Sequence, residues 1–409
     1  MQILVTSSRM PYAVSEIRAF GRMGHTVHTA DTFDWAPGNH SAHAAVHHET
    51  VSPREDPEGY IAQLNMIADM YRIDLIVPTF EEVLYLAQRG LRAGGHQAQI
   101  FAPSFELLAL LHDKGRFTAL AADLGLKVAP PRLCRSRDEF VAAIAEHDRY
   151  FARAVLSRAG SGICTNTGPL AASSRPDAVT PTEATPWIVQ PFLEGEEICS
   201  FSIVRGGHVV AHSTYRHPKA LDGCGGIVFE SLDEPRTLEA AQRIAAHLGY
   251  HGQLSFDFMA ADDGELYLIE CNPRPTAGVT VMPPEIFVPA VLGEYDGQAT
   301  RVAPAGTRRS IRSALLRDIV MNPREWRSAI EELFSDAEGV YYESDDPLPG
   351  LYQFLSLAHV LEYRRKNEDA TGKLSTDFLH DICWDGTILP PAARPLDPAA
   401  PPAARAALG

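Results

Sequence analysis

The pattern of apolar and polar positions in the first hundred residues alternates between strand-like and helix-like periods. Runs of consecutive apolar residues at 3–5 and 75–77 predict short strands buried on both faces, and residues 27–31 predict another strand that ends in an acid. The helical spacing over 13–24 predicts a helix between the first two of these strands in the chain. Because strands and helices alternate in this way, we expect residues 1–105 to form a Rossmann-like, doubly wound α/β domain.

The turn after the first strand argues against a dinucleotide cofactor in this domain. It reads Thr6-Ser7-Ser8-Arg9, where a dinucleotide site has G-x-G-x-x-G. Those glycines let the backbone approach a pyrophosphate closely, and this turn has none. The α/β pattern therefore predicts a fold without predicting a cofactor.

The rest of the chain changes its pattern twice. Residues 105–125 predict one long helix, and after about residue 138 strand patterns are joined by glycine-bearing loops, with a helix over 234–248. Residues 301–389 mix helix and strand patterns, and we expect an α/β cap that shapes the substrate pocket. The last stretch, 390–409, is rich in proline and alanine and is predicted to be a tail, because it can bury little apolar surface.

Charge and cysteine usage narrow the class of protein. The chain of 409 residues has 36 Lys+Arg against 52 Asp+Glu, a net charge of −16, which argues against the basic face that nucleic acid or an anionic membrane requires. Its start lacks the pattern of a signal peptide, and no apolar run approaches the ~20 residues of a membrane span. The 6 cysteines are scattered without a C-x-x-C pair. We therefore expect a cytoplasmic enzyme or binding protein with neither nucleic acid nor membrane as partner.

The clearest chemical signal is a predicted β-hairpin that carries oxygen ligands. Glu270 and Asn272 lie two apart in a strand pattern and so point to the same side, followed by Arg274. A turn at 262–264 would bring Asp257 of the preceding strand beside them. Carboxylate and amide oxygens suit Mg²⁺. The alternative, an acidic strand edge with surface ion pairs, is disfavoured because Glu270 ends an apolar run where an unpaired charge is costly.

The block Glu270-Cys271-Asn272-Pro273-Arg274 resembles the E-x-N-P-R block of the ATP-grasp superfamily, which includes carboxylate–amine ligases and the ATP-grasp domains of carbamoyl phosphate synthetase. The resemblance implies an α/β protein with α+β lobes. Its ATP-grasp fold, two lobes that clasp ATP over 106–300, would follow a pre-ATP-grasp domain. It also implies that Asp257, Glu270 and Asn272 bind two Mg²⁺ ions, with Mn²⁺ as an alternative.

The same resemblance implies a cationic clamp for the phosphates of ATP. Lys114 falls where the family has a basic residue, and Arg153 stands where the family usually has a lysine. Gly160, Ser161 and Gly162 fall in the glycine-rich loop, whose backbone N–H groups would close over the phosphates. Taken alone, Lys114 would be an ordinary helix lysine, and a G-x-G sequence more often marks a turn.

A third block corresponds to the hinge between the lobes in the family. The backbone from Gln190 through Phe192 to Leu193 would pair with the adenine edge. An acid after the following glycine would bind the ribose hydroxyls, and we assign this role to Glu197, with Glu196 as the alternative. Without the resemblance, this stretch is an ordinary strand that runs into an acidic turn.

Substrate contacts are less well defined by the sequence. Glu81 and Glu82 follow the strand at 75–77, at the edge where open α/β sheets bind ligands, and one of them could hold a substrate ammonium. Acidic residues are also favoured in the first turn of a helix, so Glu81 and Glu82 could instead simply begin a helix. Thr276 is a further substrate candidate, and Arg274 is assigned to the transferred phosphoryl group, which makes it the catalytic residue.

As the resemblance implies, the reaction would be an ATP-dependent, ADP-forming ligation. A small carboxylate or amino acid would form an acylphosphate, and an amine would displace phosphate. Two alternatives remain: bicarbonate activation as in carbamoyl phosphate synthetase or biotin carboxylase, and a non-catalytic ATP-binding protein. The expected partners are the small-molecule carboxylate and amine, and a homodimer is left open.

Overall fold

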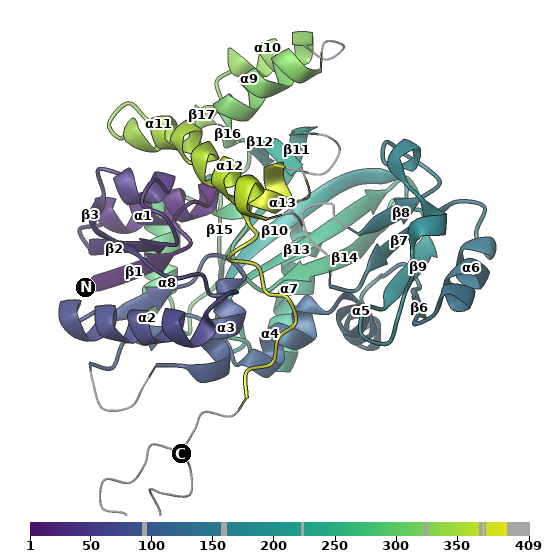
Figure 1. The fold of residues 1–409 in the computed structure, drawn as a ribbon, viewed down its shortest axis with the longest axis horizontal. Helices are drawn as coiled ribbons and strands as arrows, with labels where there is room; N and C mark the ends of the chain where they lie inside the picture. The colour runs from purple at the N-terminus through teal and green to yellow at the C-terminus, as the bar shows by residue number, and fades with distance from the viewer. Residues whose placement is uncertain are drawn as a thin grey trace, which may run out of the picture.

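The computed structural model describes residues 1–91, 96–156, 162–221, 225–322, 326–367, 371 and 374–390. Three β-sheets form the framework, and Figure 1 shows them side by side from the N-terminal sheet on the left to the smallest sheet on the right. No helix in these ranges is long and apolar enough to cross a membrane.

The N-terminal sheet confirms the predicted doubly wound domain. Its order is β3-β2-β1-β4-β5, and every pairing is parallel. Apolar side chains of β1 face the packed helices on both sides, which explains their continuous apolar run. The elements of this domain are β1 (Gln2–Thr6), α1 (Pro11–Arg22), β2 (Thr26–Asp31), η1 (Pro37–His40), β3 (Ala44–Glu49), α2 (Pro57–Tyr71), β4 (Leu75–Val77), α3 (Glu82–Arg89) and β5 (Gln99–Ile100).

A small four-stranded sheet follows, with the order β6-β9-β7-β8 and antiparallel pairing. One face packs on α6 around Phe140. Its elements are β6 (Arg132–Cys134), α6 (Arg137–Ala145), β7 (Tyr150–Ala154), β8 (Ile163–Thr165), η2 (Ala171–Ser173), η3 (Pro176–Ala178) and β9 (Trp187–Pro191).

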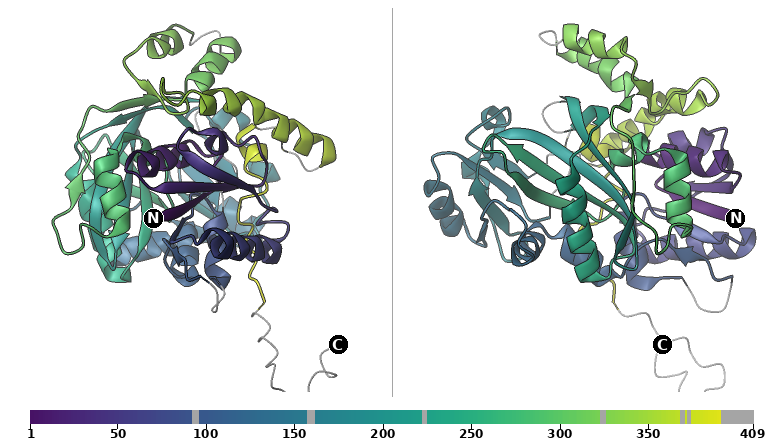
Figure 2. Two further views of the ribbon diagram at one scale, coloured as in Figure 1. Left: turned by 90° about the vertical axis from the view of Figure 1, so that its left-hand side faces the viewer. Right: turned by 180° about the vertical axis from the view of Figure 1, so that it is seen from behind.

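The largest sheet is eight-stranded and mainly antiparallel, in the order β14-β13-β10-β11-β12-β16-β17 with β15 paired to β11. Helices α5 and α7 pack against β13 and β14 in one apolar core, as Figure 2 shows from behind for α7. The elements are β10 (Gly195–Arg205), β11 (His208–Leu221), β12 (Gly225–Ser231), α7 (Pro235–Leu248), β13 (Gly252–Ala261), β14 (Leu266–Asn272), η4 (Ala277–Val281), α8 (Pro284–Leu292), β15 (Arg301–Val302), β16 (Arg308–Ser310) and β17 (Glu338–Gly339).

The single helix predicted over 105–125 is wrong. The structure has α4 (Phe105–His112) and α5 (Lys114–Asp123), separated by Asp113 in an extended conformation with φ −76° and ψ 108°. The Asp113 carboxylate accepts a hydrogen bond from the Arg116 N–H, as an N-cap does. An N-cap leaves helical geometry at its own position, so it starts a new helix and sets its direction.

The region after residue 300 contacts both the large sheet and the N-terminal domain. Strands β16 and β17 extend the large sheet, and in Figure 1 helices α9 and α10 lie at the top of the molecule while α11 lies above the N-terminal domain. Helices α11 and α12 meet at Ser356. The elements are α9 (Arg312–Met321), α10 (Trp326–Leu333), α11 (Leu348–Leu355), α12 (Leu357–Lys366) and α13 (Leu374–Phe378). Of the predicted tail, residues 391–409 lie outside the described residues.

Candidate functional site

The hairpin of β13 and β14 forms as predicted and places the expected metal ligands side by side. Asp257 lies directly opposite Glu270 in the ladder, where β14 has a bulge at Ile269. Glu270, Asn272 and the residues that follow alternate between two environments. The half-buried positions are Glu270, Asn272, Arg274 and Thr276, and the buried positions between them are Cys271, Pro273 and Pro275. One face of this segment is therefore turned to the site and the other to the core.

Two buried cations from other elements reach Glu270. Arg153 of β7 donates from Nη1 to Glu270 Oε2 at 2.8 Å and from Nη2 to the Ile269 carbonyl oxygen at 2.7 Å. Lys114, the first residue of α5, places Nζ 3.5 Å from the same Glu270 oxygen. Burial alone would raise the pKa of Glu270, but the charges of Lys114 and Arg153 outweigh it and lower the pKa to about 2. Glu270 is therefore ionised throughout the physiological range.

The pKa of Asp257 is shifted in the opposite direction to that of Glu270. Burial, and then the charges of Glu270 and Glu197, raise its pKa well above the usual value. Carboxylates held this close repel each other when both are ionised, and a divalent cation between them removes that repulsion. Asn272 donates from Nδ2 to Asp257 Oδ2 at 3.1 Å, so its amide lies within reach of the same ion. The three predicted ligands thus fit Mg²⁺ by donor type and by charge.

Arg274 lies where the large sheet meets the N-terminal domain. It donates from Nη2 to Asn272 Oδ1 at 3.1 Å, and its guanidinium lies 4.6 Å from the ring centre of Phe80, just after β4. The Nε atoms of Arg153 and Arg274 are buried without a hydrogen-bond partner among the described residues. Each arginine therefore keeps one donor for an anionic ligand.

The predicted substrate residues are held within the chain. Glu82 begins α3, is fully buried, and accepts hydrogen bonds from the Thr6 hydroxyl at 2.5 Å and the Thr79 N–H at 3.0 Å. Glu81 accepts from the Trp384 N–H at 3.0 Å. Both acids are therefore hydrogen-bonded to other segments of the chain, and contact of either with a substrate ammonium stays a prediction. Thr276 is half-buried, and its hydroxyl accepts a hydrogen bond from the Tyr215 hydroxyl at 3.0 Å. It lies two residues after Arg274, on the same half-buried face as Glu270 and Asn272.

The hinge residues join the small sheet to the large one. Gln190 is buried on β9, opposite Phe151 of β7, and the Phe192 N–H donates to the Arg149 carbonyl oxygen at 3.0 Å. Leu193 is half-buried, two residues before β10 begins at Gly195. In the glycine-rich loop, Gly162 has φ +63° and its carbonyl oxygen accepts from the Ala154 N–H at 2.9 Å, whereas Gly160 and Ser161 lie outside the described residues.

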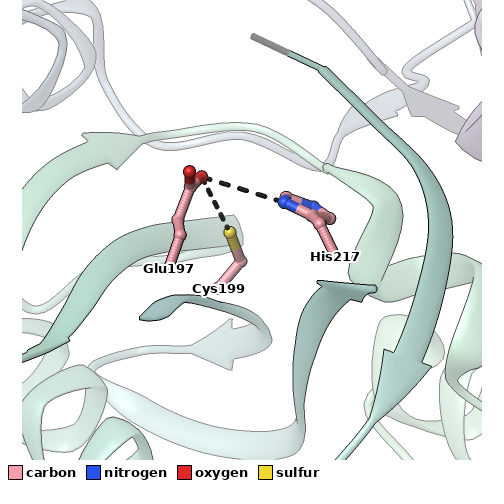
Figure 3. Close-up of side chains that lie close together, drawn as sticks. All are labelled: Glu197, Cys199 and His217. Carbon is pink, nitrogen blue, oxygen red and sulfur yellow. Dashed lines mark hydrogen bonds and ion pairs between the residues drawn. The ribbon is translucent and has the colours of Figure 1, made fainter. Parts of the chain in front are cut away.

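Alternation along β10 separates Glu197 from Glu196. Glu197 lies two residues before Cys199, which is opposite Asp257, so it shares the face of the metal ligands. Glu196 points to the other face and pairs with Arg216 at 3.2 Å. Cys199 and His217 were missed by the sequence analysis, and both lie beside Glu197 in Figure 3. Cys199 lies two residues after Glu197 on the same strand, so the sequence could have indicated that the two share a face. The position of His217 beside them depends on the register of β10 and β11, which the sequence does not show.

Comparisons with known proteins agree with this geometry. A family model described as an ATP-grasp domain matches residues 155–278. A formate-dependent phosphoribosylglycinamide formyltransferase from Mycolicibacterium vanbaalenii is 29% identical over 298 residues, which are 67% of this chain and 72% of the relative.

Solved structures show the same fold. A phosphoribosylamine–glycine ligase from Thermotoga maritima has a TM-score of 0.56 at 20% identity, covering 75% of this chain and 78% of that one. The biotin carboxylase domain dimer of Hydrogenobacter thermophilus 2-oxoglutarate carboxylase, in complex with MgADP, ADP and bicarbonate, has a TM-score of 0.54 at 16% identity, covering 73% and 71%. Residues 155–278 thus match an ATP-grasp domain, and the matched segment includes the hairpin of β13 and β14 that carries Asp257 and Glu270.

Proposed function

We propose that this ATP-grasp ligase activates a small carboxylate as an acylphosphate, with release of ADP, and transfers the acyl group to an amine. The observation that carries the proposal is the convergence of Arg153 and Lys114 on Glu270. Arg153 of the small sheet and Lys114 of α5 meet a metal-ligand carboxylate of the large sheet. Cations held against a metal site in this way are the arrangement that phosphoryl transfer requires. A formyltransferase that depends on formate, the smallest carboxylate, is among the relatives.

The chain's own residues can bind and orient both reactants. Lys114 and Arg153 would hold the phosphates of ATP, and Arg274 would donate to an oxygen of the transferred phosphoryl group from the opposite side. Glu197 would accept from the ribose hydroxyls at the far end of the same face.

Mg²⁺ fits between Asp257, Glu270 and Asn272, where it would neutralise charge on the β- and γ-phosphate oxygens. We propose two such ions, with Mn²⁺ able to replace them, and the cytoplasm as the location of the protein. A metal titration that follows ADP release distinguishes one required ion from two by the order of the dependence on free Mg²⁺.

Trapping of the activated carboxylate tests the proposed chemistry. Hydroxylamine replaces the amine substrate, and the purified protein is incubated with MgATP and a panel of small carboxylates that starts with formate and includes amino acids and bicarbonate. We expect a hydroxamate, formed in amounts equal to the ADP released, with one class of carboxylate. ADP release with bicarbonate alone would favour the carboxylase-like alternative, and ATP binding without ADP release across the panel would favour a non-catalytic protein.

We also propose that the chain is a homodimer through the face formed by α11 and α12. Exposed apolar side chains line this face: Leu348, Leu351, Phe354, Leu355, Leu357 and Leu361. Helix α9 is joined to α11 by the hydrogen bond from the Ser313 hydroxyl to the Gln353 side-chain oxygen. A contiguous set of exposed apolar side chains of this kind is typical of a protein–protein interaction surface.

Light scattering after size-exclusion chromatography tests the dimer. The wild type is expected at twice the mass of the chain, and the double variant Leu351→Glu/Phe354→Glu at the monomer mass. Met70→Glu, at an exposed apolar position on α2, is the matched control and should remain dimeric. A wild type that is monomeric at concentrations up to ~100 µM would contradict the proposal.

A further inference from the structure

A second constellation of possible ligands lies beside the proposed magnesium site. Glu197 and Cys199 are on β10, His217 is on β11, and one ligand atom of each lies within 4.8 Å of the others. Figure 3 shows that the thiol and the imidazole both approach the Glu197 carboxylate. Their chemistry differs from that of the magnesium ligands, because sulfur and nitrogen are soft or borderline donors that favour Zn²⁺ over Mg²⁺.

Of the two contacts to Glu197 in this cluster, the one from the Cys199 thiol is a hydrogen bond and the one from His217 is not. Cys199 Sγ lies 3.7 Å and His217 Nδ1 3.9 Å from the same oxygen, Glu197 Oε1. An Nδ1–oxygen separation of that length is too long for a hydrogen bond. Tetrahedral zinc with metal–ligand distances of about 2.0–2.3 Å separates its ligand atoms by about 3.3–3.6 Å, so small side-chain adjustments would close the site.

The surrounding residues orient the imidazole toward this point. The ring of His217 packs edge-on against Tyr215 at 5.4 Å and Phe229 at 5.7 Å between ring centres. Gly226 lies directly against the same ring, and a Cβ there would come within 2.2 Å of His217 Cδ2. The ring is thus confined on several sides, and its Nδ1 faces Glu197. Such confinement is what keeps a metal-binding histidine in place.

We propose that Glu197, Cys199 and His217 form a binding site for a soft divalent cation such as Zn²⁺, which shares Glu197 with the nucleotide. The three side chains provide three ligands and leave a fourth position open to water. On binding, the Cys199 thiol loses its proton to the solvent and sulfur donates to the metal, so one proton is released per ion. The competition with nucleotide rests on the proposed function, since it requires Glu197 to bind the ribose. Bound Zn²⁺ would therefore inhibit the ligase.

Cobalt spectroscopy of the metal-free full-length chain tests the site without any assay of activity. One Co²⁺ per chain should produce a sulfur-to-cobalt charge-transfer band in the near ultraviolet, and Zn²⁺ should abolish it by displacement. Cys199→Ser should remove the band, whereas Cys134→Ser, at a buried cysteine of the small sheet, should keep it. His217→Asn and Gly226→Ala should each weaken Co²⁺ binding by about tenfold or more, with the circular dichroism spectrum of each variant as the check of folding.

The outcomes separate this proposal from the proposed function. No charge-transfer band in the wild type, or a band that survives in Cys199→Ser, would overturn the metal site. Addition of ADP should raise the apparent dissociation constant for Co²⁺ in proportion to the concentration of ADP. A cysteine-dependent band that ADP leaves unchanged would support the metal site and overturn the ribose role of Glu197.

Discussion

At the scale of single residues, Glu270 joins the two halves of the site. Its carboxylate belongs to the hairpin that supplies the proposed metal ligands, and it contacts both Lys114 and Arg153. The two cations hold it ionised, with a pKa of about 2, while Asp257 beside it has a raised pKa. Opposite pKa shifts in adjacent carboxylates are typical of functional sites.

Replacement of Glu270 by glutamine should abolish ligation. The change keeps the size of the side chain but removes the charge that the metal and both cations require, so we expect the rate of ADP release to fall by at least ~100-fold. Glu265→Gln is the matched control, because Glu265 precedes β14 in the same hairpin but is exposed. Turnover retained by Glu270→Gln would contradict the metal assignment. Thermal unfolding followed by circular dichroism verifies that both variants are folded.

Removal of Arg153 should act mainly on ATP. Arg153→Ala takes away a buried cation whose Nε remains available to a ligand, and we expect the KM for ATP to rise by about tenfold or more. Arg132→Ala removes an exposed arginine from the same small sheet, where Arg132 pairs with Glu146, and should leave the KM unchanged. Equal KM values in the two variants would place the phosphate clamp elsewhere. Steady-state kinetics at saturating Mg²⁺ measures both.

At the scale of elements, the break between α4 and α5 positions Lys114. Asp113 ends the first helix and caps the second, so Lys114 becomes the first residue of a helix whose direction is independent of α4. The cap sets the direction of α5, and this direction places the Lys114 Nζ 3.5 Å from Glu270. A continuous helix over 105–125 would have placed this side chain differently.

The cap at Asp113 should therefore matter for both stability and function. Asp113→Ala is expected to cost about 1 kcal/mol of unfolding free energy and to raise the KM for ATP. Ser136 is a matched control: it caps α6 by accepting from the Glu139 N–H at 3.3 Å, outside the site. Ser136→Ala should cost a similar free energy in urea unfolding while the KM stays unchanged. A KM change of equal size in both variants would assign the effect to general destabilisation.

At the scale of the whole molecule, a buried ion network ties the two ends of the chain together. Arg9, after β1, contacts Asp31 at 2.5 Å and Asp381 at 2.7 Å, and all three side chains are buried. The same C-terminal segment supplies the Trp384 N–H to Glu81. The region after residue 300 is thus fastened to the N-terminal domain, in addition to its three strands, β15, β16 and β17, in the large sheet.

This network predicts a defined pH dependence of stability. Burial opposes ionisation of Asp381, but Arg9 outweighs it and holds the pKa of Asp381 well below its usual range. A pKa that is lower in the folded state contributes stability that is full above the unfolded value of about 3.9 and is lost as the pH falls toward the folded value. Asp381→Asn should therefore cost about 3 kcal/mol at pH 7, and its difference from the wild type should shrink below about pH 4.

Urea unfolding at a series of pH values measures this difference. The control is Asp345→Asn, because Asp345 also pairs with an arginine, Arg22 at 3.1 Å, but is exposed. An exposed pair of this kind should contribute less than about 1 kcal/mol. A loss at pH 7 that is as small for Asp381→Asn as for Asp345→Asn would contradict a structural role of the network.

The sequence alone determined the features that depend on local pattern. The doubly wound domain follows from its apolar runs, and the hairpin from the alternation around Glu270 and the turn before it. Two features of longer range were decided only by the tertiary structure. The opposition of Asp257 and Glu270 requires the bulged register of β13 and β14, and the contact of Arg153 with Glu270 requires two sheets to meet.

The same reason explains what the sequence analysis missed. His217 lies beside Glu197 because β10 and β11 pair in one register, and a shift of one residue would turn it to the other face. In the same way, the sequence could not show that Glu81 accepts a hydrogen bond from the Trp384 N–H, which lies 303 residues later in the chain. Periodicity fixes which residues share a strand or helix face, whereas the packing of separate elements decides which of those faces meet.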